Sequence, residues 1–192
     1  IIWIEALNVM SSFTVNCNGE NYELLMVILT CIVEIEDITA KIYKIIAKHF
    51  PNYIASILLH IARESQNHYD TLKSLKELLE CEEYSNIVCS YEGVLLLRNK
   101  LEEVMRAEAR GRLRNEELIK LFDYLVEVEQ FASEEYYVMI IMPLLIERLY
   151  EIGIPVSYAN IWKWILEEIS QEEKYHAKIA ESIREYLVAH SD

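Results

Sequence analysis

The stretch ISQEEKYHAKIA, residues 169–180, places two polar side chains on a helical face that is otherwise apolar. In steps of three and four, an apolar stripe runs from Trp162 to Leu187, and Glu173 and His176 both fall on it. A buried carboxylate costs on the order of several kcal/mol unless it is paired or binds a metal. Carboxylate oxygens and neutral imidazole nitrogens are ligands of iron, manganese and zinc. Glu173 and His176 are therefore candidate metal ligands.

Three other segments each carry a comparable polar residue on an apolar stripe of helical period. These residues are Glu36, His68 and Glu129. No lysine or arginine occupies any of the four stripes, so no basic side chain is in position to neutralise the carboxylates. A divalent cation would neutralise them, and the polar residues together predict a metal site.

An internal repeat relates the four segments. IVEIEDITAKIYKI matches LVEVEQFASEEYYV at an offset of 93 residues, which places Glu36 over Glu129. IARESQNHYDTL matches ISQEEKYHAKIA at an offset of 108, which places His68 over His176. The chain thus resembles two copies of a helical hairpin, each with a glutamate on its first helix and a histidine on its second.

The elements that must position these residues are long helices. With 192 residues, 53% apolar content, 4 Gly and 3 Pro, the chain is long enough for one domain with a real core, and its apolar residues recur with period 3.6. Pro143 is expected to kink the third long helix. The predicted all-α domain covers residues 21–190, with helices at about 21–49, 52–80, 116–150 and 158–189, a crossover containing one short helix at 81–115, and an unplaced segment at 1–20.

Charge and hydropathy limit the partners. A net charge of −14 repels nucleic acid and anionic lipid and favours cations. The longest apolar runs are too short to span a bilayer, and no basic segment followed by an apolar stretch indicates a signal peptide. We expect a cytoplasmic protein that binds neither nucleic acid nor membranes.

The four cysteines form no CxxC motif, which argues against a rubredoxin-like iron site and a thioredoxin-like motif. Cys81 and Cys89 flank EEYSNIV in the crossover. They either pair with each other or remain free thiols.

Together these features resemble the ferritin-like superfamily of carboxylate-bridged dimetal proteins, and most closely its rubrerythrin-like branch. The pattern is a glutamate from each of two helices plus Glu-x-x-His from each of the other two, in an antiparallel four-helix bundle with one long crossover. The resemblance covers about residues 22–187. It implies a metal site built from Glu36, His68, Glu129, Glu173 and His176.

The chain departs from this pattern at Ser65, where the resemblance requires a bridging glutamate. Glu64 lies one residue earlier and four residues before His68, nearly on the same helical face. A local bulge in the helix would allow Glu64 to act as the missing ligand. Without it, the site has three carboxylates.

The resemblance implies two iron ions, with manganese or zinc as alternatives, and an oxidoreductase that acts on peroxide or dioxygen. A separate electron donor would then be needed, because no rubredoxin segment is present. The alternatives are iron sequestration in an oligomer, and a bundle with a degenerate site that serves as a structural or interaction protein. Ile28, Ile35 and Ile42 form a second apolar face, which predicts a homodimer or a higher homo-oligomer.

Several polar residues near the stripes have less specific interpretations. Tyr43 and Tyr136 follow the two glutamates by seven residues and either donate hydrogen bonds to ligands or, as we favour, pack in the core. His60 is expected at the surface or the rim of the site. Glu34, Glu127 and Glu172 are expected on a solvated face.

Overall fold

The computed structural model describes residues 20–81, 84, 86–111, 113–132 and 140–190. Within these ranges every regular element is helical, which confirms the predicted all-α class. The elements are α2 (Glu20–Ile46), the 3-10 helix η1 (Ala47–His49), α3 (Asn52–Leu79), α4 (Glu92–Ala109), α5 (Asn115–Phe131), α6 (Met142–Glu151) and α7 (Val156–Ala189).

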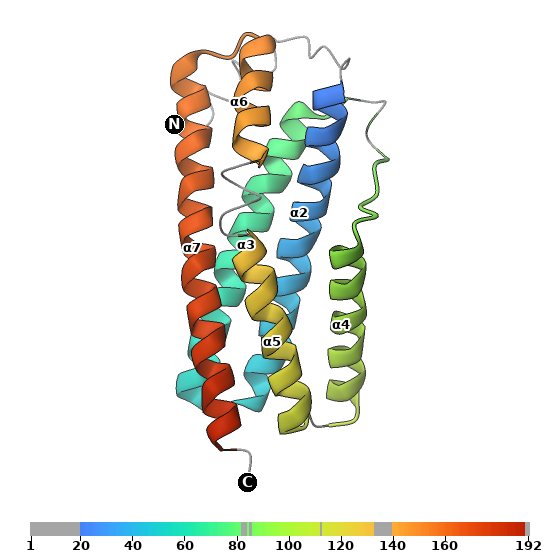
Figure 1. Ribbon diagram of the computed structural model, residues 1–192, viewed down its shortest axis with the longest axis vertical. Coiled ribbons are helices and arrows are strands. Elements are labelled where there is room, and N and C mark those ends of the chain that lie inside the picture. The colour runs from blue at the N-terminus through green and yellow to red at the C-terminus, as the bar shows by residue number, and fades with distance from the viewer. Residues whose placement is uncertain (1–19, 82–83, 85, 112, 133–139, 191–192) are drawn as a thin grey trace.

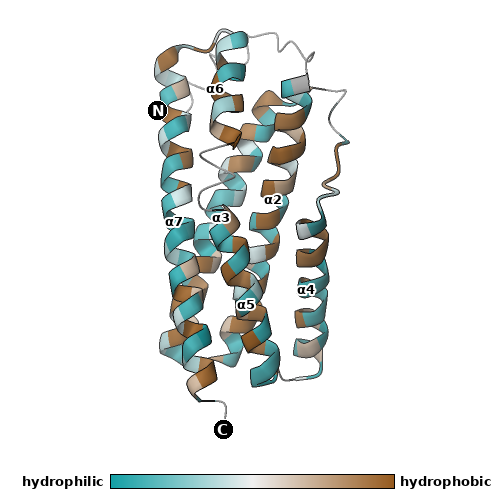
Figure 2. Ribbon diagram, viewed as in Figure 1, coloured by the Kyte–Doolittle hydropathy of each residue, from teal (hydrophilic) through white to brown (hydrophobic). Residues whose placement is uncertain are grey.

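The helices lie side by side along one long axis (Figure 1). Helices α2 and α3 form an antiparallel hairpin, while α5 and α6 follow one another in the direction opposite to α7 (Figure 1). Helix α4 flanks α2 on the side away from α7 (Figure 1). Apolar residues gather where the helices face one another, and polar residues lie on their outer faces (Figure 2).

The observed helices fall close to the predicted spans. Helix α2 begins at Glu20 and continues through η1 to His49, and α3 ends at Leu79. Helix α4 lies within the predicted crossover. The long last helix begins at Val156, two residues before its predicted start.

Two helices lie in the region of the predicted third long helix, 116–150. Helix α5 ends at Phe131, and α6 begins at Met142. Ala132 and residues 140–141 have π-helical hydrogen bonding, and the segment between them lies outside the described residues. Pro143 sits in the first turn of α6, a position at which proline is well tolerated, and the kink expected there stays a prediction.

A glycine ends α6 and redirects the chain into α7. Gly153 has a φ of +80°, a conformation that residues with a side chain rarely adopt. The N–H of Ile154 then donates to the carbonyl of Leu149 at 2.8 Å, as in a Schellman motif. Pro155 immediately precedes α7.

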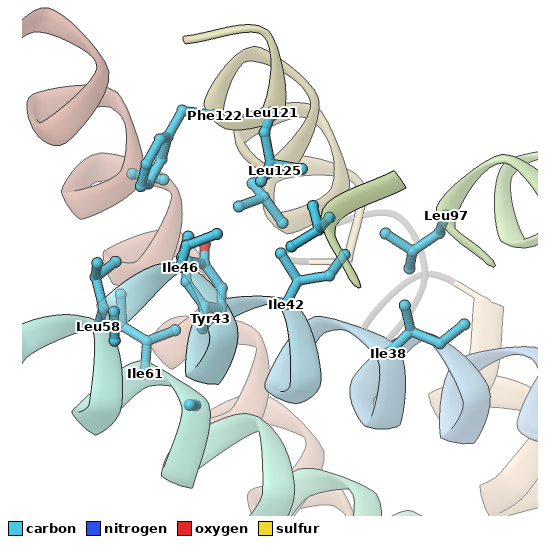
Figure 3. Packing of buried hydrophobic residues seen from close by; sticks show 14 of the residues in the cluster. Ile38, Ile42, Tyr43, Ile46, Leu58, Ile61, Leu97, Leu121, Phe122 and Leu125 are labelled. Carbon is cyan, nitrogen blue, oxygen red and sulfur yellow. The ribbon is translucent and has the colours of Figure 1, made fainter. Parts of the chain in front are cut away.

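The core consists of two apolar clusters, one toward each end of the bundle. The first gathers Ile42, Tyr43, Leu58, Phe122 and Leu125, together with the carboxyl-terminal part of α7 (Figure 3). The second is built from the amino-terminal halves of α2 and α7, the end of α3, and α6. On α3 and α7, most of the buried residues between these clusters are polar.

Helix α4 covers the second apolar face of α2. Ile28, Ile35 and Ile42 are each at most 9% exposed, and the latter two share a cluster with Val94 and Leu97 of α4. This face is therefore buried within the chain and gives no support to the predicted dimer. A homo-oligomer stays a prediction without that support.

Two further contacts hold the α4 region against α2. Cys31 forms a disulfide with Cys89, so the expectation that Cys89 pairs with Cys81 or stays free was wrong. Arg98 makes an ion pair with Glu34, which therefore does not lie on a freely solvated face. Both partners on α2 are five or fewer residues from Glu36, so these contacts anchor the part of α2 that carries a predicted ligand.

Within the described ranges, none of the helices combines the length and the apolar character that crossing a bilayer requires.

Candidate metal centre

A layer of buried polar side chains separates the two apolar clusters. Helix α2 contributes one residue, α5 one, and α3 and α7 two each, as the 3.6-residue stripes predict. The layer consists of Glu36, Ser65, His68, Glu129, Glu173 and His176, each at most 4% exposed.

Glu173 lies at the centre of this layer. Three ligand atoms from Glu36, His68 and Glu173 lie within 4.8 Å of one another, and we call this set the His68 group. A second set, the His176 group, consists of Glu129, Glu173 and His176 and meets the same limit. The two groups share Glu173, and the two imidazole rings lie 6.1 Å apart between centroids.

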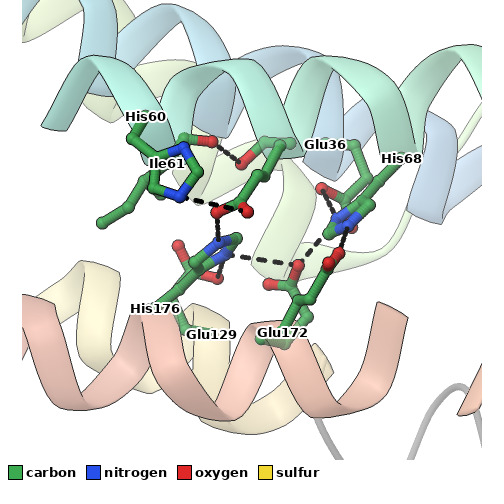
Figure 4. A network of polar contacts seen from close by, with 10 residues as sticks. Glu36, His60, Ile61, His68, Glu129, Glu172 and His176 are labelled. Carbon is green, nitrogen blue, oxygen red and sulfur yellow. Dashed lines mark hydrogen bonds and ion pairs between the residues drawn. The ribbon is translucent and has the colours of Figure 1, made fainter. Parts of the chain in front are cut away.

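The same nitrogen of each imidazole faces the carboxylates (Figure 4). Nδ1 of His68 lies 2.8 Å from Oε1 of Glu173 and 3.6 Å from Oε2 of Glu36. Nδ1 of His176 lies 3.4 Å from the same Glu173 oxygen and 3.6 Å from Oε2 of Glu129. Each group therefore offers two carboxylates and one imidazole nitrogen.

Several of these atoms are buried without a hydrogen bond of acceptable geometry from any described residue. They are Nδ1 of His68, Nδ1 of His176, Oε1 of Glu129 and Oε1 of Glu173. Buried polar atoms normally have partners, so unsatisfied ones need an explanation. A cation in each group would accept their lone pairs, and the donor set of carboxylate oxygens and imidazole nitrogens suits iron, manganese or zinc.

The outer nitrogen of each imidazole contacts a carboxylate on the opposite hairpin. Nε2 of His68, on α3, lies 2.7 Å from Oε2 of Glu172 on α7. Nε2 of His176, on α7, lies 3.0 Å from Oε2 of Glu64 on α3. We call Glu64 and Glu172 the outer carboxylates. They correspond to each other at the repeat offset of 108 residues, so the layer has an approximate twofold arrangement.

The outer carboxylates change two sequence-based expectations. Glu172 was expected on a solvated face, but its side chain is 36% exposed and fixes His68. Glu64, predicted as a metal ligand, belongs to neither group, because its carboxylate lies on the outer side of His176. It therefore matches Glu172 in position and does not occupy the place that Glu173 holds in the other hairpin.

Ser65 occupies that place and turns away from the centre. Its hydroxyl donates to the carbonyl of Ile61 at 3.2 Å, a backbone hydrogen bond within α3. The layer thus contains three buried carboxylates. His60 lies at the rim, as predicted, with its side chain 60% exposed and Nε2 3.3 Å from Oε1 of Glu64.

Proximity to the carboxylates alters the pKa values of the histidines. Burial lowers the pKa of His68, but contacts with Glu173 and Glu36 outweigh it and raise the pKa to about 11. Burial also lowers the pKa of His176, and its contacts with Glu129 and Glu173 raise it to about 12. Without a metal, both imidazoles are therefore protonated at neutral pH and partly neutralise the carboxylates.

The pKa values of Glu129 and Glu173 shift in opposite directions. Burial, followed by the charge of Glu173, raises the pKa of Glu129 to about 8. Burial and the charge of Glu36 also act to raise the pKa of Glu173, but contacts with Glu129 and the two histidines lower it below its usual value. A proton in the metal-free layer therefore resides on Glu129 in preference to Glu173.

Tyr43 lies close to this layer. Burial, followed by the charge of Glu129, raises the pKa of its phenol well above the usual value. Its hydroxyl makes no hydrogen bond of acceptable geometry with the described part of the chain, and its ring packs in the first apolar cluster. The favoured interpretation, core packing, agrees with this position. Tyr136 lies outside the described residues.

A cavity of about 300 Å³ lies elsewhere, between α4 and α5, and its lining includes Lys100, Arg110 and Lys120. It includes no residue of the His68 or His176 group. The parts of the polar network that reach solvent are instead the outer carboxylates and His60.

Comparisons with protein-family models, with curated proteins and with solved structures find no match to this chain.

Proposed function

We propose that this protein is a ferritin-like helical bundle that binds two metal ions, one that the His68 group would hold and one that the His176 group would hold, with Glu173 common to both groups. The observation that carries the proposal is the set of unsatisfied buried atoms from α3, α5 and α7 that converge on the two groups, to which α2 adds the buried Glu36. A buried layer of this kind costs folding free energy unless a cation compensates for it.

The chain's own residues would prepare the site for metal. Glu172 and Glu64 hold the outer nitrogens of His68 and His176, which leaves both Nδ1 atoms directed at the carboxylates. Outer carboxylates in this position fix the ring orientation of a ligand histidine and increase its basicity. The apolar clusters on both sides exclude bulk water and hold the helices in register.

The proposed activity is an oxidoreductase reaction on peroxide or dioxygen with iron. Two reduced iron ions would supply electrons at coordination positions that the protein leaves open. Each group provides three ligand residues, which supports open coordination positions. A separate protein would donate electrons in repeated turnover.

A metal-free role is the second candidate. The elevated pKa values of His68 and His176 give two positive charges that partly neutralise the three carboxylates. A bundle with such an ion-pair layer would serve as a structural or interaction protein. Iron sequestration is a further alternative, and it requires an oligomer in addition to metal binding.

The cellular location is also a proposal. A cytoplasmic location was predicted, but structural disulfides such as Cys31–Cys89 occur in oxidising compartments and in intracellular proteins of hyperthermophiles. The disulfide therefore favours the cytoplasm of a hyperthermophile, or an oxidising compartment, over the reducing cytoplasm of a mesophile.

The decisive experiment is metal analysis combined with thermal unfolding. The protein, purified without chelator, should contain up to two ions per chain, and adding Fe²⁺, Mn²⁺ or Zn²⁺ to the metal-free form should raise Tm. Glu173→Gln should lose both ions, because Glu173 belongs to both groups. Glu167→Gln, an exposed change on the same helix, is the matched control. If none of the three metals binds or changes Tm, the metal-free role is correct.

A further inference from the structure

One polar residue of the network has no part in the proposed metal site itself. His60 is exposed on α3, yet its imidazole contacts the carboxylate that holds His176 (Figure 4). Nε2 of His60 lies 3.3 Å from one oxygen of Glu64, and Nε2 of His176 lies 3.0 Å from the other. A single carboxylate therefore joins a solvent-exposed imidazole to a buried one.

The exposure of these side chains falls in steps from the surface inward. The exposed fraction is 60% for His60 and 26% for Glu64, and it is 2% for His176. His60 and Glu64 are four residues apart on α3, so both side chains project from one helical face. Two ligands at this spacing can hold one divalent cation, as the paired residues of helical zinc sites do.

We infer that His60 and Glu64 capture a divalent cation at the surface and pass it to the His176 group. This inference rests on the proposed function. When Glu64 turns toward a captured cation, it gives up its contact with Nε2 of His176. That imidazole is then free to rotate, which opens the path between the captured ion and the Glu129 and Glu173 carboxylates.

The other hairpin lacks this arrangement and supplies a control. The repeat offset of 108 residues places Glu168 at the position equivalent to His60, and Glu168 is exposed four residues before Glu172. No imidazole stands there. The uptake route through His60 is therefore a property of the His176 half of the site.

The test is the kinetics of Co²⁺ binding to the metal-free protein, followed by stopped-flow absorption, alongside equilibrium titration. Substitution of a residue that lies on the uptake route, but is not a ligand in the final site, changes the association and dissociation rates by the same factor and leaves Kd unchanged. We expect His60→Gln to slow both rates for the ion in the His176 group about tenfold, within the range over which local charge and ligands alter association. The number of ions bound should stay the same.

Two variants sharpen the result. His60→Glu keeps a cation ligand and should retain the association rate of the unaltered protein. Glu168→Gln, the matched change in the other hairpin, should leave the kinetics of the His176 group unchanged. Since His60 and Glu168 are exposed, these variants should fold normally, and thermal unfolding of the metal-free forms checks this.

Three outcomes overturn the inference. If His60→Gln takes up Co²⁺ at the unaltered rate, the ion enters elsewhere, while the proposed metal site stands. If the variant has a higher Kd but an unchanged association rate, His60 positions Glu64 and does not capture ions. If the unaltered protein binds no Co²⁺, Fe²⁺ or Mn²⁺, the proposed function fails and this inference fails with it.

Discussion

Oε1 of Glu173 lies 2.8 Å from Nδ1 of His68, across the space between α7 and α3. The same oxygen lies 3.4 Å from Nδ1 of His176 on its own helix. One carboxylate thus serves two imidazoles from different hairpins. A change in the charge or protonation of Glu173 consequently alters the electrostatic environment of both groups.

Glu129→Gln should stabilise the metal-free protein at alkaline pH. The folded-state pKa of Glu129 is about 8, above the ordinary value of 4.5, so the cost of its buried charge grows as pH rises from about 4.5 to 8. At pH 9 we expect the variant to gain on the order of 1 kcal/mol in the free energy of unfolding, and at pH 6 to gain much less. Urea unfolding at both pH values measures this.

The control for this prediction is Glu127→Gln, an exposed change on the same helix, which should have little effect at either pH. A loss of stability in Glu129→Gln at pH 9 would mean that the Glu129 charge is compensated in the metal-free protein.

Metal binding should release protons. At pH 7 the metal-free protein holds protons on His68, on His176 and largely on Glu129, whose pKa values are about 11, 12 and 8. A ligand must lose its proton, so filling both groups should release up to three protons, one from each residue. Calorimetric titration of metal in buffers of different ionisation enthalpy counts them.

The raised pKa values of His68 and His176 also make the stability of the metal-free protein depend on pH. The folded-state pKa values of both histidines exceed the ordinary value of 6.5, so their stabilising contribution is complete below about pH 6.5 and is lost as pH rises toward 11 and 12. Tm of the metal-free protein should fall with rising pH, whereas metal affinity should rise. Parallel pH trends of Tm and affinity would contradict this assignment of protons.

Ser65→Glu should add the carboxylate that the resemblance requires. A fourth carboxylate better balances the charge of two divalent ions, so metal affinity and the peroxide-dependent oxidation of Fe²⁺ should increase. In the metal-free protein the same substitution should lower Tm, because it places another negative charge in a buried layer. Ser65→Gln has nearly the same size without the charge and separates the two effects. Equal metal binding by both variants would exclude a ligand role at this position.

Glu172→Ala should lower the affinity of the His68 group for its metal ion without removing any ligand. Loss of an outer carboxylate that orients a ligand histidine typically costs about 10- to 100-fold in metal affinity. Titration of the metal-free variant should therefore show one ion that binds more weakly than in the unaltered protein and one ion whose affinity is unchanged. Glu168→Ala, one turn earlier on α7, is the control. Equal weakening of both ions would indicate that Glu172 acts through the whole layer.

Replacing Cys31 and Cys89 together with alanine should destabilise the protein without changing metal stoichiometry. The disulfide closes a loop of 58 residues, for which the chain-entropy relation gives about 4 kcal/mol. Urea unfolding measures the loss, and metal analysis of the folded variant tests independence from the site. A variant that folds but binds fewer ions would show that the disulfide also positions Glu36 on α2.

The helices and the buried layer could be predicted because both follow from local periodicity. Glu36, His68, Glu129 and His176 interrupt apolar stripes, and the 3.6-residue period alone fixes which way such residues point. The disulfide between Cys31 and Cys89 could not be predicted, because it joins residues separated by 58 positions and depends on how α2 and the segment before α4 lie in space. Hydrophobic periodicity reports which face of a helix is buried and carries little information about such tertiary distances.

The outer carboxylates could not be identified from sequence for a different reason. Glu172 and Glu64 lie just beside the stripes, where a carboxylate is usually solvated. Their contacts with His68 and His176 depend on how closely α3 and α7 approach, which is a tertiary distance. The repeat contained a usable signal, since the two glutamates occupy equivalent positions one residue before Glu173 and Ser65.

The separation of the core into two apolar clusters affects how the molecule unfolds. Helices α2, α3 and α7 pass through both clusters, but between them the helices meet through carboxylates and imidazoles. In the metal-free protein polar contacts, and not apolar packing, join the two clusters at this level, so the two ends can open with different free energies. An ion in each group would link α2, α3, α5 and α7 at that level, and the two ends of the bundle would then unfold as a single cooperative unit.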